Sequence, residues 1–141
     1  MKGEEINALI KVKALRLRET DKEKVKSMVE SAKINVKIAL SIPLTEESAT
    51  VIFREIYESV RQLGDASWWL LGYEPLNHEI SLEILKEADI KAKVKLNFLE
   101  RFKKIRDDAN YRGFRVTVSQ AEEIIIFWKE CAVEIITKIK L

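Results

Sequence analysis

Residues 49–71 read ATVIFREIYESVRQLGDASWWLL, and this stretch decides the fold class. Its apolar side chains recur every three or four positions, which is the spacing of one face of an α-helix. The face comprises Ala49, Ile52, Phe53, Ile56, Val60, Leu63, Ser67, Leu70 and Leu71. Thr45 is the expected N-terminal cap and Gly72 the expected stop, because glycine adopts the left-handed conformation that ends many helices. Gly64, in the middle of this helix, predicts a close crossing with a neighbouring element.

The same spacing extends along most of the chain on both sides of this helix. We expect further helices over residues 4–18, 21–41, 78–88, 93–112 and 119–140. Two capping boxes are expected at helix starts, formed by Thr20 with Glu23 and by Ser119 with Glu122. The apolar face expected for the helix over 93–112 comprises Val94, Phe98, Phe102, Ile105 and Ala109.

Long helices joined by short links predict an all-α, up-and-down antiparallel bundle of four to five main helices. Two prolines and four glycines leave little room for a sheet with many turns, and Pro43 ends the helix over 21–41. A chain of 141 residues fits one domain, residues 1–141, because single domains run to roughly 100–200 residues.

The single cysteine and single histidine exclude two kinds of site. Cys131 has no partner for an internal disulfide, and a structural zinc site needs about four ligands. With no glycine-rich phosphate loop either, we expect no metal and no cofactor. The longest unbroken apolar run, residues 124–128, is far shorter than the ~20 residues of a membrane-spanning helix, and no signal peptide is evident. The expectation is a soluble cytoplasmic protein. Abundant Lys and Glu are typical of proteins from hot environments.

The net charge is only +2, but it is unevenly distributed. Residues 1–40 carry +4 and residues 45–90 carry −7. Residues 91–115 hold nine Lys or Arg and three Asp or Glu, a net charge of +6. This pattern has two interpretations. Neighbouring helices have complementary charges, or residues 91–115 form a basic surface that attracts phosphate.

Residues 106–113 read RDDANYRG and gather polar groups near the end of an expected helix, which Gly113 can close. Helix geometry places Arg106 and Asn110 on one face, and Asp107 with Tyr111 on the next. Arginine binds phosphate through two parallel hydrogen bonds, and tyrosine can stack on a base. The candidate nucleotide- or RNA-binding residues are therefore Arg106, Asp107, Asn110, Tyr111 and Arg112. If the chain is an enzyme, the catalytic candidates are Arg106 and Tyr111. Alternatively, these Asp and Arg side chains only pair with one another and with the acidic middle of the chain.

His78 is the only histidine, which excludes a mechanism that needs two histidines in one chain. It precedes an apolar helical pattern, so a capping or packing role is the simpler interpretation. His78 and Lys103 are supporting candidates for the basic site.

Three segments together resemble one known family. They are residues 54–61, REIYESVR; residues 72–79, GYEPLNHE; and residues 106–113, followed by the Ala121-Glu122-Glu123 helix. Their order and spacing are similar to those of the HEPN domains, the "higher eukaryotes and prokaryotes nucleotide-binding" family, and especially of its archaeal stand-alone members. The resemblance implies a bundle of four or five helices that dimerises across the face bearing the Arg motif. It also implies either a metal-independent ribonuclease, often a toxin, or a non-catalytic partner of a minimal nucleotidyltransferase in a two-gene module.

The ribonuclease members have an Arg, a polar residue, three further positions and then a His. Arg106 matches the Arg, Asp107 matches the polar position, and Tyr111 stands where the His would be. A general base works best when its pKa is near the operating pH, whereas an unperturbed tyrosine titrates near ~10. This departure argues against catalysis, while Arg106 can still hold a phosphate.

The leading hypothesis is a HEPN-type homodimer that binds a nucleotide or RNA and works with a nucleotidyltransferase partner in a toxin–antitoxin-like module. In such a dimer, Arg106 and Tyr111 of both chains line one shared cleft. The alternatives are a metal-independent endoribonuclease toxin and a non-catalytic helical dimerisation or interaction module.

Overall fold

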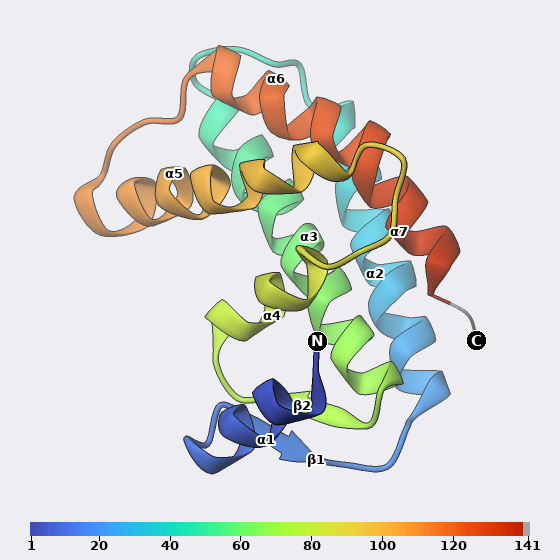
Figure 1. Cartoon of the computed structure of the whole chain (residues 1–141). Helices are drawn as coiled ribbons and strands as arrows, with labels where there is room; N and C mark the ends of the chain where they lie inside the picture. Colours follow the sequence, from blue (N-terminus) through green and yellow to red (C-terminus); the bar gives the residue numbers. More distant parts are fainter. Residues whose placement is uncertain (140–141) are drawn as a thin grey trace.

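The computed structural model describes residues 1–139, and nearly all of its regular structure is helical (Figure 1). In chain order the elements are α1 (Gly3–Lys11), β1 (Leu15–Leu17), α2 (Lys22–Ser41), α3 (Ala49–Leu70), β2 (Tyr73–Pro75), α4 (His78–Leu85), a 3-10 helix η1 (Lys93–Asn97), α5 (Phe98–Arg112), α6 (Val118–Phe127), a π-helical turn η2 (Trp128–Ala132) and α7 (Val133–Lys138). The predicted all-α class is confirmed, with one short pair of strands in addition. Within residues 1–139, none of the helices has the length and apolar character needed to cross a membrane.

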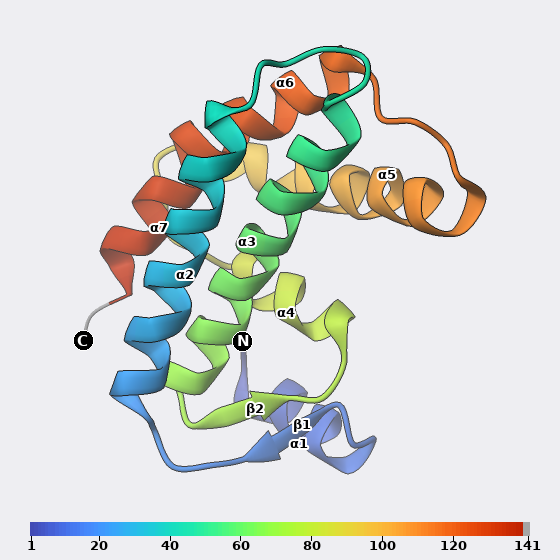
Figure 2. The same cartoon turned by 180° about the vertical axis from the view of Figure 1, so that it is seen from behind.

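Helix α3 is the centre of the molecule. It packs against α2, α4, α5 and α6, and α2 runs antiparallel beside it (Figures 1 and 2). Most of its predicted apolar face is buried, and three rings from α3, α5 and α6 pack edge to face in the core. The Phe102 ring lies 6.0 Å from Phe53 and 5.3 Å from Phe127, centre to centre. These contacts fix α5 against the central helix.

Helix α5 departs from the predicted up-and-down arrangement. It lies across α3 in both views, and its C-terminal end projects beyond the bundle (Figures 1 and 2). The helix expected over residues 93–112 is divided into η1 and α5. Phe102 and Ala109 are buried as predicted, but Val94 is 81% exposed and Phe98 is 42% exposed. The prediction fails at Val94 because the 3-10 turn changes the helical period before α5 begins. Phe98 lies on the predicted face and stacks on Phe102, with 6.0 Å between the ring centres, but its ring is only partly covered.

The prediction of one helix over residues 4–18 is wrong. Helix α1 ends at Lys11, and Lys13 has a left-handed backbone with φ of 61°. Residues Leu15–Leu17 then form β1, which pairs antiparallel with β2 so that Leu15 lies opposite Pro75. Leu15 packs with the buried Trp68 in a small second core under α1. This burial, which depends on residues far along the chain, overrides the local helical pattern.

Several helix boundaries also differ from the prediction. Helix α4 ends at Leu85, and the last helix is divided by η2, with residue 140 outside the described residues. The caps are Asp21, which accepts from the Lys24 amide, and a capping box of Thr117 with Gln120, in place of the predicted boxes. Thr45 bonds with Ser48 in the turn before α3 rather than capping it directly. Helix α6 starts at Val118 because Thr117 caps it. The preceding Val116 is buried and donates its amide hydrogen to Thr50 Oγ1 at 3.0 Å.

The close crossing predicted at Gly64 is confirmed. A Cβ atom on Gly64 would lie 1.8 Å from the carbonyl oxygen of Ser81, so α3 and α4 touch backbone to backbone. At the same crossing, the Ser81 hydroxyl donates a hydrogen bond to Asp65, the residue that follows Gly64. The crossing therefore holds α4 against a row of polar residues on α3, which forms one side of the candidate site.

Candidate functional site

Arg106 is held by contacts from two helices. Its guanidinium carbon lies 5.5 Å from the centre of the Tyr57 ring on α3, and its Nη1 donates to Asp107 Oδ1 at 3.0 Å. The side chain is 19% exposed. A guanidinium has five N–H donors, and the bond to Asp107 uses one of them. Arg106 is thus an oriented, partly buried cation that retains donors for an anion.

The ring of Tyr57 lies under the Arg106 guanidinium. The side chain is almost completely buried and stacks on Phe53, with 6.4 Å between the ring centres. Burial raises the pKa of its hydroxyl to about 12, although the positive charge of Arg106 acts in the opposite direction. The phenol therefore stays protonated at neutral pH.

A second arginine continues this polar row along α3. Arg61 donates to Glu58 and, through Nη1 at 3.0 Å, to Asp65 Oδ2. Burial raises the pKa of the Asp65 carboxyl, while the hydrogen bond from Ser81 and the charge of Arg61 oppose this rise. Tyr57, Arg61 and Asp65 follow one another at four-residue spacing, so they lie on one face of α3. We call these three residues with Arg106 and Asp107 the α3–α5 polar cluster.

The structure separates the other predicted residues from this cluster. Tyr111 is 78% exposed, and five positions of an α-helix place its side chain about 140° around α5 from Arg106. Asn110 and Arg112 are also exposed, and the Arg112 guanidinium carbon lies 5.8 Å from the centre of the exposed Phe114 ring. Arg106 and Asp107 therefore belong to a packed cluster, whereas Tyr111 and Arg112 belong to the projecting end of α5.

The two supporting candidates lie on the α4 side of the cluster. His78 is the first residue of α4 and is exposed, and its charge acts on the nearby Asp65. The capping role considered for His78 belongs to Asn77, whose side chain accepts from the Ile80 amide at 3.1 Å. Lys103 Nζ bonds Glu79 at 3.2 Å and so links α5 to α4.

Sequence reasoning missed Tyr57, Arg61 and Asp65 as members of the site. Their four-residue spacing was visible in the sequence, but the apolar residues of the same helix gave a stronger pattern. Only the fold shows that the Arg106 face of α5 meets this face of α3. The signal that could have found them is a row of ionisable residues at helical spacing on an otherwise buried helix.

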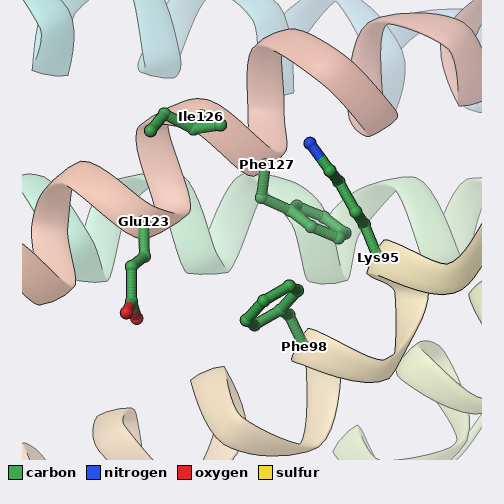
Figure 3. A pocket seen from close by; sticks show the side chains of 5 residues that line it. All are labelled: Lys95, Phe98, Glu123, Ile126 and Phe127. Carbon is green, nitrogen blue, oxygen red and sulfur yellow. The ribbon is translucent and has the colours of Figure 1, made fainter. Parts of the chain in front are cut away.

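A distinct apolar pocket lies on the other flank of α5. Lys95, Phe98, Glu123, Ile126 and Phe127 line a hollow of about 210 Å³. In Figure 3 the rings of Phe98 and Phe127 face the same space between α5 and α6. None of the predicted site residues lines it. Among residues 1–139, no three His, Cys, Asp or Glu side chains gather in a group that could hold a metal ion.

Comparison with models of known protein families, with curated proteins and with solved structures found no match for this chain.

Proposed function

We propose that this chain is a HEPN-type nucleotide- or RNA-binding protein in which Arg106 contacts phosphate. The observation that carries the proposal is the Arg106 guanidinium, which is held on the Tyr57 ring with one of its five donors used by Asp107. A cation fixed in this way loses little conformational entropy when it binds an anion. Arginine can then bind a phosphate group through two parallel hydrogen bonds.

The neighbouring residues have roles that follow from their positions. The protonated Tyr57 hydroxyl donates a hydrogen bond to the same anion, and Asp107 keeps the guanidinium in place. The exposed Tyr111 ring offers a surface on which a base can stack, and Asn110 can read a base edge. The net charge of +6 over residues 91–115 attracts the ligand to this end of the molecule.

We also propose that the protein is a homodimer and works with a minimal nucleotidyltransferase in a toxin–antitoxin-like pair. This part rests on the resemblance of residues 54–61, 72–79 and 106–113 to HEPN domains. A purely binding role fits this chain better than RNA cleavage. Tyr57 is a poor proton acceptor because burial raises its pKa to about 12, and Tyr111 takes the place of the family histidine.

One observation favours a second candidate, the helical interaction module. Within the α3–α5 polar cluster, Arg61 is paired with Glu58 and Asp65, and Arg106 is paired with Asp107. In this candidate function the cluster only satisfies its own charges and binds neither nucleotide nor RNA. The two functions therefore differ in one measurable property, which is affinity for an anionic ligand that depends on Arg106.

The test is a titration of AMP and of a short single-stranded RNA into the wild type, Arg106→Ala and Lys104→Ala, at two salt concentrations with EDTA present. Lys104 is the matched control because it is an exposed cation on the same helix, outside the cluster. We expect binding that weakens with salt, is lost in Arg106→Ala and is nearly retained in Lys104→Ala. Equal losses in the two variants would indicate only a general charge effect, and no binding by the wild type would favour the interaction module.

A further inference from the structure

The turn from α5 to α6 carries an exposed aromatic side chain beside a small hollow. This turn joins the projecting end of α5 to the start of α6 (Figures 1 and 2). Phe114 is 55% exposed in the turn and lines a hollow of about 130 Å³. The Arg112 guanidinium carbon lies 5.8 Å from the centre of the Phe114 ring. An exposed ring beside a cation is typical of sites where an unpaired nucleic-acid base stacks.

Other side chains that line this hollow can hydrogen-bond to the edge of a base. Asp108 comes from α5, and Gln120 comes from the first turn of α6. The Gln120 side-chain oxygen accepts the Thr117 amide hydrogen at 3.0 Å, which leaves the Gln120 amide nitrogen as a donor. Asp108 Oδ2 accepts from Lys104 Nζ at 3.3 Å, and the carboxylate has further acceptor positions. The hollow therefore has an acceptor and a donor next to an aromatic ring.

Two arginines of the same turn can contact the phosphates of a ligand in this hollow. Arg112 and Arg115 are both exposed. Arg115 lines the hollow, and its Nη2 donates to the main-chain oxygen of Glu47 at 2.6 Å. That bond holds the side chain in place and uses one of the five N–H donors of the guanidinium. The hollow thus combines the three kinds of group that bind a nucleotide of a single strand, which are a ring, edge-reading groups and cations.

We propose that this hollow binds a guanine base of a single-stranded RNA. The inference rests on the proposed function, because Arg106 holds a phosphate of the same strand. The Watson–Crick edge of guanine has two adjacent N–H donors, at N1 and N2, and an acceptor oxygen, O6. The two donors match the Asp108 carboxylate, and O6 matches the Gln120 amide nitrogen. Phe114 then stacks on the face of the base.

The positions of these residues around α5 favour a strand over a mononucleotide. At about 100° per residue, Tyr111 lies about 140° around the helix from Arg106, and Asp108 lies about 200° from it in the same sense. Tyr111 is thus between the Arg106 flank and the hollow, on the outer side of α5. A single nucleotide cannot contact both flanks, whereas a strand that passes over Tyr111 can. A double helix does not fit, because its bases are paired and stacked within the duplex.

The test is a set of binding titrations with the wild type, Phe114→Ala, Asp108→Asn and Ile38→Ala. The ligands are AMP, a six-nucleotide uridine RNA with one inner guanosine, and the same RNA with adenosine in that position. Ile38 is the matched control, since it is 58% exposed and lies on α2, which does not line the hollow.

We expect the guanosine RNA to bind the wild type at least tenfold more tightly than AMP does. Phe114→Ala should weaken RNA binding by about tenfold and leave the AMP affinity unchanged, because it removes one base–aromatic contact. Asp108→Asn should remove the preference for guanosine over adenosine, since it replaces one acceptor oxygen with a donor. Ile38→Ala should change none of these affinities.

Four results would overturn the inference. They are guanosine RNA that binds no more tightly than AMP, no preference for guanosine in the wild type, RNA affinity unaffected by Phe114→Ala, and equal losses of RNA affinity in Phe114→Ala and Ile38→Ala. Arg106→Ala separates this inference from the proposed function. RNA binding that needs Arg106 but not Phe114 would contradict the inference alone. RNA binding that needs Phe114 but persists in Arg106→Ala would contradict the phosphate contact of the proposed function.

Discussion

The guanidinium carbon of Arg106 lies 5.5 Å from the centre of the Tyr57 ring, so a cation from α5 rests on an aromatic side chain of the central helix. A cation–π contact of this kind contributes roughly 0.5–2 kcal/mol, more when the pair is desolvated. Asp107 Oδ1 accepts a hydrogen bond of 3.0 Å from the same guanidinium. Together these two contacts give the Arg106 guanidinium a defined position in the absence of a ligand.

Replacing Tyr57 with Phe should weaken ligand binding more than it weakens the fold. The ring under Arg106 remains, so the change in unfolding free energy should stay within about 1 kcal/mol. The lost hydroxyl removes one donor from the anion, and binding of AMP should weaken about three- to tenfold. Thermal melts and AMP titrations measure the two effects. Tyr73→Phe, which alters a tyrosine on β2, is the control, and unchanged AMP affinity in Tyr57→Phe would contradict the role given to its hydroxyl.

The free energy of unfolding should fall at high pH because Tyr57 remains protonated up to a higher pH in the folded chain than in the unfolded chain. Its pKa is about 12 when folded, chiefly because of burial, whereas an unfolded tyrosine titrates near ~10. The unfolded state therefore releases the proton first, so this contribution is fully present below pH ~10 and is lost towards pH ~12. Urea unfolding across this range should show a steeper loss in the wild type than in Tyr57→Phe, and parallel curves would contradict the assignment.

The crossing of α3 and α4 gives a sharp test of the fold. Gly64→Ala would place Cβ 1.8 Å from the Ser81 carbonyl oxygen, so the helices must move apart. We expect a loss of about 1–3 kcal/mol or more, and a lower melting temperature. Gly3→Ala is the control, because nothing lies within 4 Å of its added Cβ, and it should be neutral or slightly stabilising. A Gly64→Ala protein as stable as Gly3→Ala would show that the crossing is not as close as described.

Two buried hydroxyl groups should respond in opposite ways to removal. Thr50 Oγ1 accepts the Val116 amide hydrogen at 3.0 Å, so Thr50→Val leaves a buried donor unpaired and should cost about 1–3 kcal/mol. The buried Ser59 Oγ has no hydrogen-bond partner within residues 1–139, so Ser59→Ala should be neutral or stabilising. Chemical denaturation of both variants measures the difference. A large loss of stability in Ser59→Ala would indicate an undetected partner for that hydroxyl.

Helical periodicity predicted the elements best where burial is continuous. The apolar face of α3 and the close contact at Gly64 were both predicted from residue spacing. The strands β1 and β2 were not, because their pairing joins Leu15 to Pro75, sixty positions apart. Val94 was misplaced because a 3-10 turn has three residues per turn, and so a helical pattern read through it points to the wrong side.

Only part of the candidate site was predicted, because contacts between separate helices cannot be inferred from residue spacing. Arg106 and Asp107 form a pair that local spacing could suggest. Tyr57 could not be joined to them from the sequence, because the contact depends on how α5 crosses α3. Tyr111 was grouped with Arg106 on the basis of proximity in the chain, yet it lies on the outer side of α5. When several helices contribute residues to one cluster, its members can be identified only after the crossing of those helices is known.

The central claim is that the Arg106 guanidinium binds phosphate, and side-chain NMR tests it most directly. The Nε–H resonance of each arginine can be followed while AMP is added to ¹⁵N-labelled protein, with Arg106→Lys used for assignment. We predict that the Arg106 signal shifts and saturates, while that of Arg101, which is paired with Glu123 on the other flank of α5, stays in place. An Arg106 signal that does not move as AMP is added, or one that moves only together with Arg101, would contradict the claim.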